Sequence, residues 1–173
     1  MSVSLHAALI PSFQRVIGAA QGWLDKAEDF AKGKGISEGE IAEWRLIEDM
    51  LPFSYQIKSM MVHSKGAIEG CRAEVFSPDF SEPPANFADL RAMLHSAAAF
   101  LAALDSAEVN ALGDKPMRFE IGEKRLDFVN AAEFLFSFSL SNFYFHAVTA
   151  YDVLRSKGVP VGKLDYLGQL PVR

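Results

Sequence analysis

The chain has 173 residues, of which 50% are hydrophobic and 23% are charged, and its formal net charge is −5. The length predicts a single domain over residues 1–173, and the composition is ordinary for a soluble globular protein. The acidic balance argues against a basic surface for nucleic acid, and no apolar run is long enough for a transmembrane helix, so we expect no nucleic acid and no membrane as partners.

Four segments show the three-and-four spacing of apolar residues that is typical of helices with one buried face. The first covers residues 5–31, and the second lies within residues 38–71. Pro52 divides the second segment, so either its main helix begins near Pro52 or one continuous helix is kinked there. After a proline-rich loop, the third helix is expected at about 87–105 and the fourth at about 130–156.

Residues 116–128 read PMRFEIGEKRLDF, in which apolar and charged residues alternate on both sides of Gly122. This alternation predicts a short β-hairpin. The C-terminal tail, VGKLDYLGQLPVR, is too rich in Gly and Pro for another helix, and we expect it to lie over the helices. Together these elements predict an all-α fold: a four-helix bundle with a small β-hairpin between helices three and four.

The fourth helix has a wider apolar arc than one core face needs. A helical wheel puts five residues near Asn142, namely Phe138, Phe145, His146, Thr149 and Val153, and five on the far side, namely Phe136, Leu140, Phe143, Ala147 and Leu154. A helix that is apolar nearly all round is central or covered. We therefore expect a homodimer through helix four. The alternative is that the loop after helix two or the C-terminal tail covers this helix.

The most distinctive segments of the sequence are LDKAEDFAKGKGI, RLIEDMLPFSYQI followed by HSKGA, and above all NFYFHAVTAYDVLRSKGVPVGKLDYLG. These segments resemble a bacterial family of uncharacterised proteins that is grouped in the DinB-like superfamily. The resemblance covers nearly the whole chain. It implies an up-down-down-up bundle and frequent dimers. Many members of the superfamily hold a divalent metal with three histidines, and some members transfer low-molecular-weight thiols. The resemblance therefore also implies a candidate metal site in this chain.

The histidines of this chain match that metal pattern only in part. By the resemblance, His63 corresponds to the ligand on the second helix, and His146 corresponds to one member of a His-x-x-x-His pair on the last helix. The residues four positions from His146 are Asn142 and Ala150, which are not normal ligands of zinc or nickel. A Zn or Ni site would therefore use His63 and His146, with water or Asn142 completing the coordination. This is the alternative function, a divalent-metal-dependent thiol transferase.

Polar residues interrupt the apolar face of the second segment. Asp49, Gln56 and His63 are spaced by seven and would stack on one face of a continuous helix. One interpretation is a small polar ligand pocket that these residues form with Asn142 and His146 of helix four. The other is internal hydrogen bonding, in which Asp49 caps the turn at Pro52 and Gln56 and Asn142 satisfy each other. The pocket hypothesis requires His63 and His146 to converge in space.

The chain lacks the motifs of common enzyme classes. It has no GxSxG elbow and no glycine-rich phosphate loop. The single cysteine, Cys71, excludes an intramolecular disulfide, and the first residues lack the pattern of a signal peptide, so we expect a cytoplasmic location. The leading prediction is a DinB-like bundle protein that binds a small ligand or partner between helices two and four, without a clear catalytic constellation.

Overall fold

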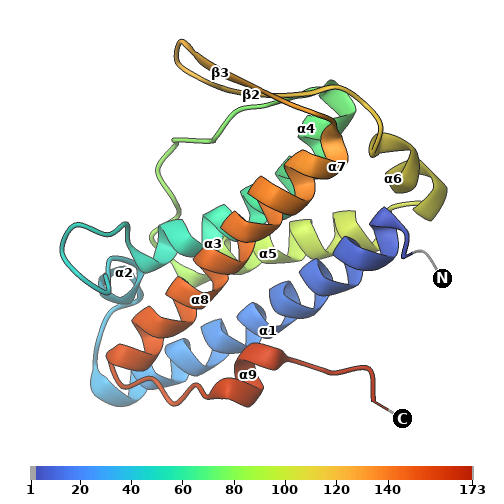
Figure 1. Ribbon diagram of the computed structural model, residues 1–173. Helices are drawn as coiled ribbons and strands as arrows, with labels where there is room; N and C mark the ends of the chain where they lie inside the picture. The colour runs from blue at the N-terminus through green and yellow to red at the C-terminus, as the bar shows by residue number, and fades with distance from the viewer. Residues whose placement is uncertain (1–2, 173) are drawn as a thin grey trace.

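The computed structural model describes residues 3–172, which form a mostly helical molecule with one small sheet at one end (Figure 1). The helices are α1 (Leu5–Lys34), α2 (Glu38–Ala42), α3 (Phe53–Met61), η1 (Val62–Gly66), α4 (Ala67–Ala73), α5 (Phe87–Ala102), α6 (Ser106–Leu112), α7 (Ala131–Glu133), η2 (Phe134–Ser139), α8 (Leu140–Ser156) and α9 (Lys163–Leu167), of which η1 and η2 are π-helical. The strands are β1 (Val75–Phe76), β2 (Met117–Ile121) and β3 (Lys124–Phe128).

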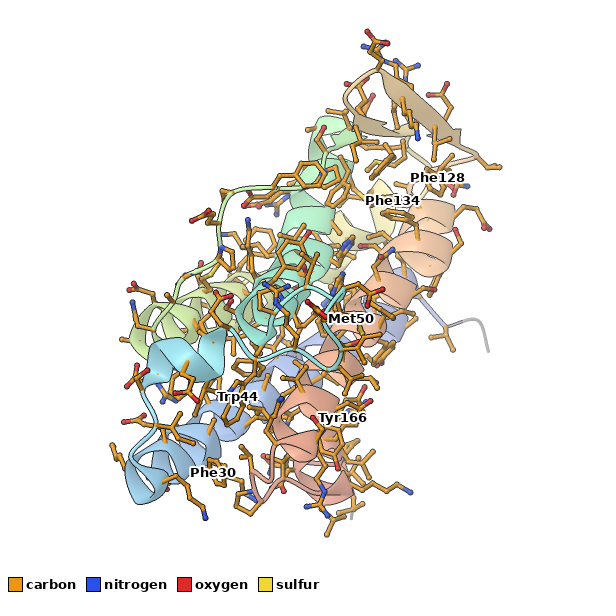
Figure 2. The ribbon with its side chains drawn as sticks, turned by 90° about the vertical axis from the view of Figure 1, so that its left-hand side faces the viewer. Phe30, Trp44, Met50, Phe128, Phe134 and Tyr166 are labelled. Atoms are coloured by element: carbon orange, nitrogen blue, oxygen red, sulfur yellow. The ribbon has the colours of Figure 1, made fainter. Side chains whose placement is uncertain are left out.

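One core lies among the long helical segments. Helix α1 packs against α5 and α8, and α3 packs against the same two helices. Aromatic pairs lie at both ends of the molecule: Phe30 and Trp44 have ring centroids 6.2 Å apart, and Phe128 and Phe134 are 5.3 Å apart beneath the sheet (Figure 2). The apolar faces that the sequence predicts therefore meet in a continuous interior.

The second helical segment begins at Pro52, as the first of the two alternatives predicts. Phe53 is the first residue of α3, and Pro52 precedes it in an extended conformation. Residues 43–52 form a loop, which is closed by a hydrogen bond of 2.8 Å from the backbone N–H of Phe53 to the carbonyl oxygen of Trp44. Residues before Pro52 therefore do not share a helix face with those after it.

The third segment is shorter than expected because a separate helix follows it. Helix α5 ends at Ala102, and Asp105 caps α6 by accepting hydrogen bonds from the backbone N–H groups of Ala107 and Glu108. Within the described residues, no single helix is long and apolar enough to cross a membrane. The pair α5 and α6 meets the criteria of length and composition only together and is bent by 95°.

The apolar residues that the helical wheel places around α8 are divided between the core and the solvent. Phe143, Ala147 and Leu154, which the wheel puts on the far side, are fully buried. Phe143 packs on Phe13 of α1, with ring centroids 4.7 Å apart. Phe145, which the wheel puts on the near side, is 56% exposed. Residues 140–156 follow one regular helix, in which these buried and exposed residues lie on different sides, and the π-helical turns of η2, which nothing in the sequence predicted, precede it.

The predicted hairpin is confirmed, and it belongs to a larger sheet. Strands β2 and β3 pair antiparallel, with Phe119 opposite Leu126, and Gly122 adopts a φ of 56° in the turn between them. The short strand β1 adds to β2 in parallel, with Phe76 opposite Phe119. The sequence did not predict β1, because two residues are too few to show an alternating pattern.

The C-terminal tail lies over the helices as expected, but the prediction that it contains no helix is wrong. Helix α9 packs on α1, where the ring of Tyr166 stacks on Trp23 at 5.7 Å between centroids. The ammonium of Lys26 bonds to the carboxylate of Asp165 at 2.7 Å, and that carboxylate also accepts the backbone N–H of Gly162. These tertiary contacts stabilise a helix of five residues that has a glycine at each end and is too short to be stable alone.

Candidate functional site

The structure brings His63 and His146 together. His63 lies in η1 and His146 in α8, and their rings stack with centroids 5.6 Å apart and planes inclined by 13°. His63 is only 8% exposed, and His146 is partly buried. The convergence on which the pocket hypothesis depends is therefore present in the fold.

The hydrogen bond between Gln56 and His146 determines which ring nitrogen of His146 carries the proton. The side chain of Gln56 is 2% exposed, and its Nε2 donates a hydrogen bond of 2.9 Å to the carbonyl oxygen of Leu51. Because that carbonyl can only accept, the other end of the amide is an oxygen, and Oε1 lies 2.7 Å from Nδ1 of His146. Nδ1 of His146 therefore carries the proton, which leaves the lone pair of a neutral ring on Nε2.

The ring of His63 lies among aromatic side chains and has an unpartnered nitrogen. Its centroid is 5.6 Å from that of Phe76 and 5.7 Å from that of Phe138. Its Nδ1 is buried and makes no hydrogen bond with any described residue. Buried polar atoms usually find a partner, because leaving one unpaired costs free energy. Nδ1 of His63 and Oγ of Ser54 are the two buried polar side-chain atoms without a partner among the described residues, and only the first belongs to the pair of rings.

Burial keeps both rings neutral. It lowers the pKa of His63 to about 3, with a smaller contribution from the neighbouring His146. Burial also lowers the pKa of His146 to about 4. At neutral pH the pair is thus two uncharged imidazoles, which can donate or accept hydrogen bonds but carry no positive charge.

The helical segments that carry the two histidines both contain π-helical turns, and a hydrogen bond joins one set of turns to the other. The hydroxyl of Ser139, at the end of η2, donates a hydrogen bond of 3.0 Å to the backbone carbonyl of His63 in η1. The hydroxyl of Ser64 bonds to the carbonyl of Met60 one turn back. Serine hydroxyls that compete for helix carbonyls widen or bend helices, and π-helical turns are frequent at functional sites. The serines were visible in the sequence, but nothing in their spacing predicted the π-helical turns.

Two of the other predicted pocket residues lie elsewhere or are turned away. Asp49 is exposed in the loop before Pro52, so its inclusion in the pocket is wrong, because the proline ends any helical continuity with Gln56. Asn142 is on the same helix as His146, but its Nδ2 donates 2.8 Å to the carbonyl oxygen of Phe138. The alternative in which Gln56 and Asn142 satisfy each other is not what the structure shows, since their bonds go to other partners.

The donor set does not fit a resident zinc or nickel ion. Among residues 3–172, no three His, Cys, Asp or Glu side chains lie close enough together to share a metal. A catalytic zinc site needs three protein ligands and one open position, and here only His63 and His146 come together. Asn142 bonds through its amide N–H to the carbonyl oxygen of Phe138, and an amide oxygen is not a normal ligand of zinc. The structure thus offers a pair of imidazoles where the superfamily pattern has three.

Sequence reasoning missed three features next to the pair. Tyr55 packs on His146 with centroids 6.2 Å apart. Lys58 is only 2% exposed, and its ammonium bonds to the carbonyl oxygens of Asp79 and Ser81. A cavity of about 650 Å³ lies between the loops around residues 43–52 and 80–85, with Tyr55 in its lining. A lysine on a helix usually faces solvent and a tyrosine occurs at both buried and exposed positions, so neither residue type signals such a position.

Comparison with known proteins agrees with the family resemblance. Residues 5–167 match the family described as Domain of unknown function (DUF1993). The crystal structure of a DinB family member protein from Shewanella denitrificans superposes with a TM-score of 0.81 at 25% sequence identity, covering 98% of this chain and 94% of that one. No curated protein matches the chain. The chain belongs to the DUF1993 family and has a DinB-like helical fold.

Proposed function

We propose that this protein is an up-down-down-up four-helix bundle that binds a small ligand between its second and fourth long helical segments, α3–η1 and α8. The observation that carries the proposal is the stacked pair of neutral imidazoles, in which Nδ1 of His63 has no partner and the bond between His146 and Gln56 leaves the lone pair of His146 on Nε2. A ligand that completes the hydrogen bonding of the pair would remove the cost of that unpaired polar atom.

The surroundings indicate the chemistry of such a ligand. Rings pack around the pair: Phe76 and Phe138 beside His63, and Tyr55 and Phe145 beside His146. A site of aromatic walls with a few polar atoms is typical of a pocket for a small molecule. Because both imidazoles are neutral, an uncharged planar molecule with a hydrogen-bond donor suits them best. Its donor would meet the lone pair on Nε2 of His146.

A binding role fits the pair better than catalysis. No carboxylate of residues 3–172 hydrogen-bonds to either ring, and burial lowers the pKa of both imidazoles to well below the neutral range that suits a general base. The donor set does not fit the metal ion of the superfamily pattern either, and a metal-dependent thiol transferase is therefore not the function that we propose.

We also propose a homodimer through α8 in the cytoplasm. Three large apolar side chains are exposed on the fourth segment: Phe136 at 42%, Phe145 at 56% and Val148 at 42%. Exposed apolar groups of this kind are often covered by a partner, and a two-fold dimer would place the same helix on both sides. The tail covers another part of α8, because Tyr166 packs on Tyr151 with centroids 5.8 Å apart.

Phenol is a direct probe of the histidine pair, because it is planar, uncharged and carries one strong donor. We expect phenol to shift the Nε2 resonance of His146 in ¹⁵N-histidine spectra to saturation, whereas toluene, which lacks the hydroxyl, leaves it unmoved. His146→Phe should abolish the binding of phenol, and His95→Phe, at an exposed position of α5, should not. An unmoved Nε2 resonance up to the solubility limit of phenol would contradict the proposal.

A further inference from the structure

We propose that the cavity between the loops at residues 43–52 and 80–85 binds a small organic cation with an aromatic or apolar body. Its volume of about 650 Å³ lies within the usual range for small-molecule sites. The lining residues are Glu43, Arg45, Leu51, Pro52, Tyr55, Phe80, Ser81, Glu82, Pro83 and Ala85. None of them is a histidine, so the inference does not depend on the function proposed for the histidine pair.

Both walls of the cavity are held by buried polar side chains from α3. On one side, the ammonium of Lys58 lies 2.5 Å from the carbonyl oxygen of Ser81, 2.8 Å from its hydroxyl oxygen and 3.1 Å from a carboxylate oxygen of Asp79. On the other side, the amide of Gln56 bonds to the carbonyl of Leu51. Loops that are fixed before binding lose less entropy when a ligand arrives, so this irregular part of the chain is preorganised.

The charges of the lining favour a cation. The guanidinium of Arg45 is engaged within its own loop, since Nη1 donates to the carbonyl of Met50 at 2.6 Å and Nη2 lies 3.5 Å from the carboxylate of Glu43. Glu82 forms no ion pair with any residue between 3 and 172. One of the two carboxylates is thus unneutralised, and the net charge of the chain, −5, adds a general attraction for cations.

The aromatic side chains favour an organic cation over a metal ion. Phe80 is 66% exposed at the cavity, and Tyr55 is partly buried in its lining. Ring faces attract ammonium groups and also pack against the apolar body of a ligand. Pro52 and Pro83 add apolar surface to the lining. Carboxylate and ring together therefore select an ammonium group attached to an apolar body.

The cavity is also connected to the histidine pair. Gln56 bonds at one end to Leu51, which lines the cavity, and at the other end to His146. Tyr55 lines the cavity and packs on the ring of His146. A ligand in the cavity is expected to change the environment of His146 without touching it, which gives the experiment a second readout.

Three molecules of matched size test the charge preference: 2-phenylethylammonium, 2-phenylethanol and 3-phenylpropionate. Each is titrated into the full chain and followed by backbone ¹H–¹⁵N spectra at neutral pH. We expect the ammonium compound to bind about tenfold more tightly than the alcohol and the carboxylate, with shifts at the loops and at His146. Equal affinity for all three would overturn the proposal, and so would the absence of shifts at residues 43–55 and 80–85.

Two variants localise the site, and a third is the control. Glu82→Gln and Phe80→Ala each alter an exposed side chain, so the fold should be kept, and each should weaken binding of 2-phenylethylammonium by about threefold to fivefold. Glu123→Gln removes an exposed carboxylate at the hairpin turn and should leave affinity unchanged. If all three variants bind alike, the cation is not in this cavity. A failure here would leave the phenol test of the histidine pair unaffected.

Discussion

Two buried polar groups in one helical segment, the ammonium of Lys58 and the ring of His63, differ in their hydrogen bonding. Lys58 brings a charge into the interior, and its ammonium contacts the carbonyl and hydroxyl oxygens of Ser81 and the carbonyl and carboxylate oxygens of Asp79. His63 brings a neutral ring, and its Nδ1 has no partner among the described residues. The fully bonded group has a structural role, because its partners are a loop that it holds in place. The ring of His63 holds no segment in place by hydrogen bonding, and this contrast is why we propose the ligand site at the histidines.

The largest expected effect is on the pH dependence of stability. Each histidine has a pKa of 6.5 when unfolded and a lower one when folded, about 3 for His63 and about 4 for His146. The unfolded chain therefore binds protons first as the pH falls, and stability is lost from about pH 6.5 down to about pH 4 for His146 and about pH 3 for His63. Each ring should account for about 3 kcal/mol of the loss at pH 4.

Urea unfolding of the wild type and of His63→Phe/His146→Phe, at pH 7 and pH 4, measures this difference. The carboxylates are common to both proteins, so their contribution cancels. The double variant should lose much less stability on acidification than the wild type does. An equal loss in the two proteins would mean that the rings are not held neutral.

Removal of the Lys58 ammonium should have the next largest effect. Lys58→Met keeps the length of the side chain but leaves the acceptors on Asp79 and Ser81 without a donor, so we expect about 2 kcal/mol of destabilisation. Lys124→Met, at an exposed position of β3, is the control and should change the free energy of unfolding by less than about 0.5 kcal/mol. Similar values for both variants would contradict a structural role for Lys58.

A smaller effect is expected where the two π-helical segments meet. Ser139→Ala removes the hydroxyl that bonds to the backbone carbonyl of His63, which should lower the free energy of unfolding by about 1 kcal/mol. The control is Ser137→Ala in the same π-helical segment, where the hydroxyl is exposed and bonds only to its own helix at Glu133. Thermal unfolding of both variants measures the difference. A loss from Ser137→Ala as large as that from Ser139→Ala would argue against a specific contact.

The smallest effect on folding, but a decisive one on assembly, is expected from Phe145→Ser. The side chain is 56% exposed, so the free energy of unfolding of the monomer should change by less than about 0.5 kcal/mol. If α8 forms the dimer interface, sedimentation should show a dimer for the wild type and a monomer for the variant. Phe80→Ser, at another exposed phenylalanine, should leave the assembly unchanged. A monomeric wild type would contradict the proposed homodimer through α8.

The sequence predicted what depends on local periodicity and on family resemblance. The main helices, the hairpin around Gly122 and the pairing of His63 with His146 are of this kind. Asp49 does not stack with Gln56 and His63, as their seven-residue spacing predicts, because Pro52 interrupts the helix between them.

The remaining features arise from tertiary contacts that have no local pattern. The two π-helical segments are joined by a hydrogen bond between Ser139 and His63, which are far apart in the chain. The burial of Lys58 depends on where the loop after β1 runs, and helix α9 depends on contacts with Trp23 of α1. The gap in the metal pattern was already visible in the sequence, because the residues four positions from His146 are Asn142 and Ala150.

The central claim, two neutral imidazoles of which His146 is protonated on Nδ1, is tested most directly by two-bond ¹H–¹⁵N spectra of the histidine rings between pH 8 and pH 4. We predict the pattern of an Nδ1-protonated neutral ring for His146 and no titration of either ring above pH 5. Protonation of His146 on Nε2 at neutral pH, or titration of both rings near pH 6.5, would contradict the account.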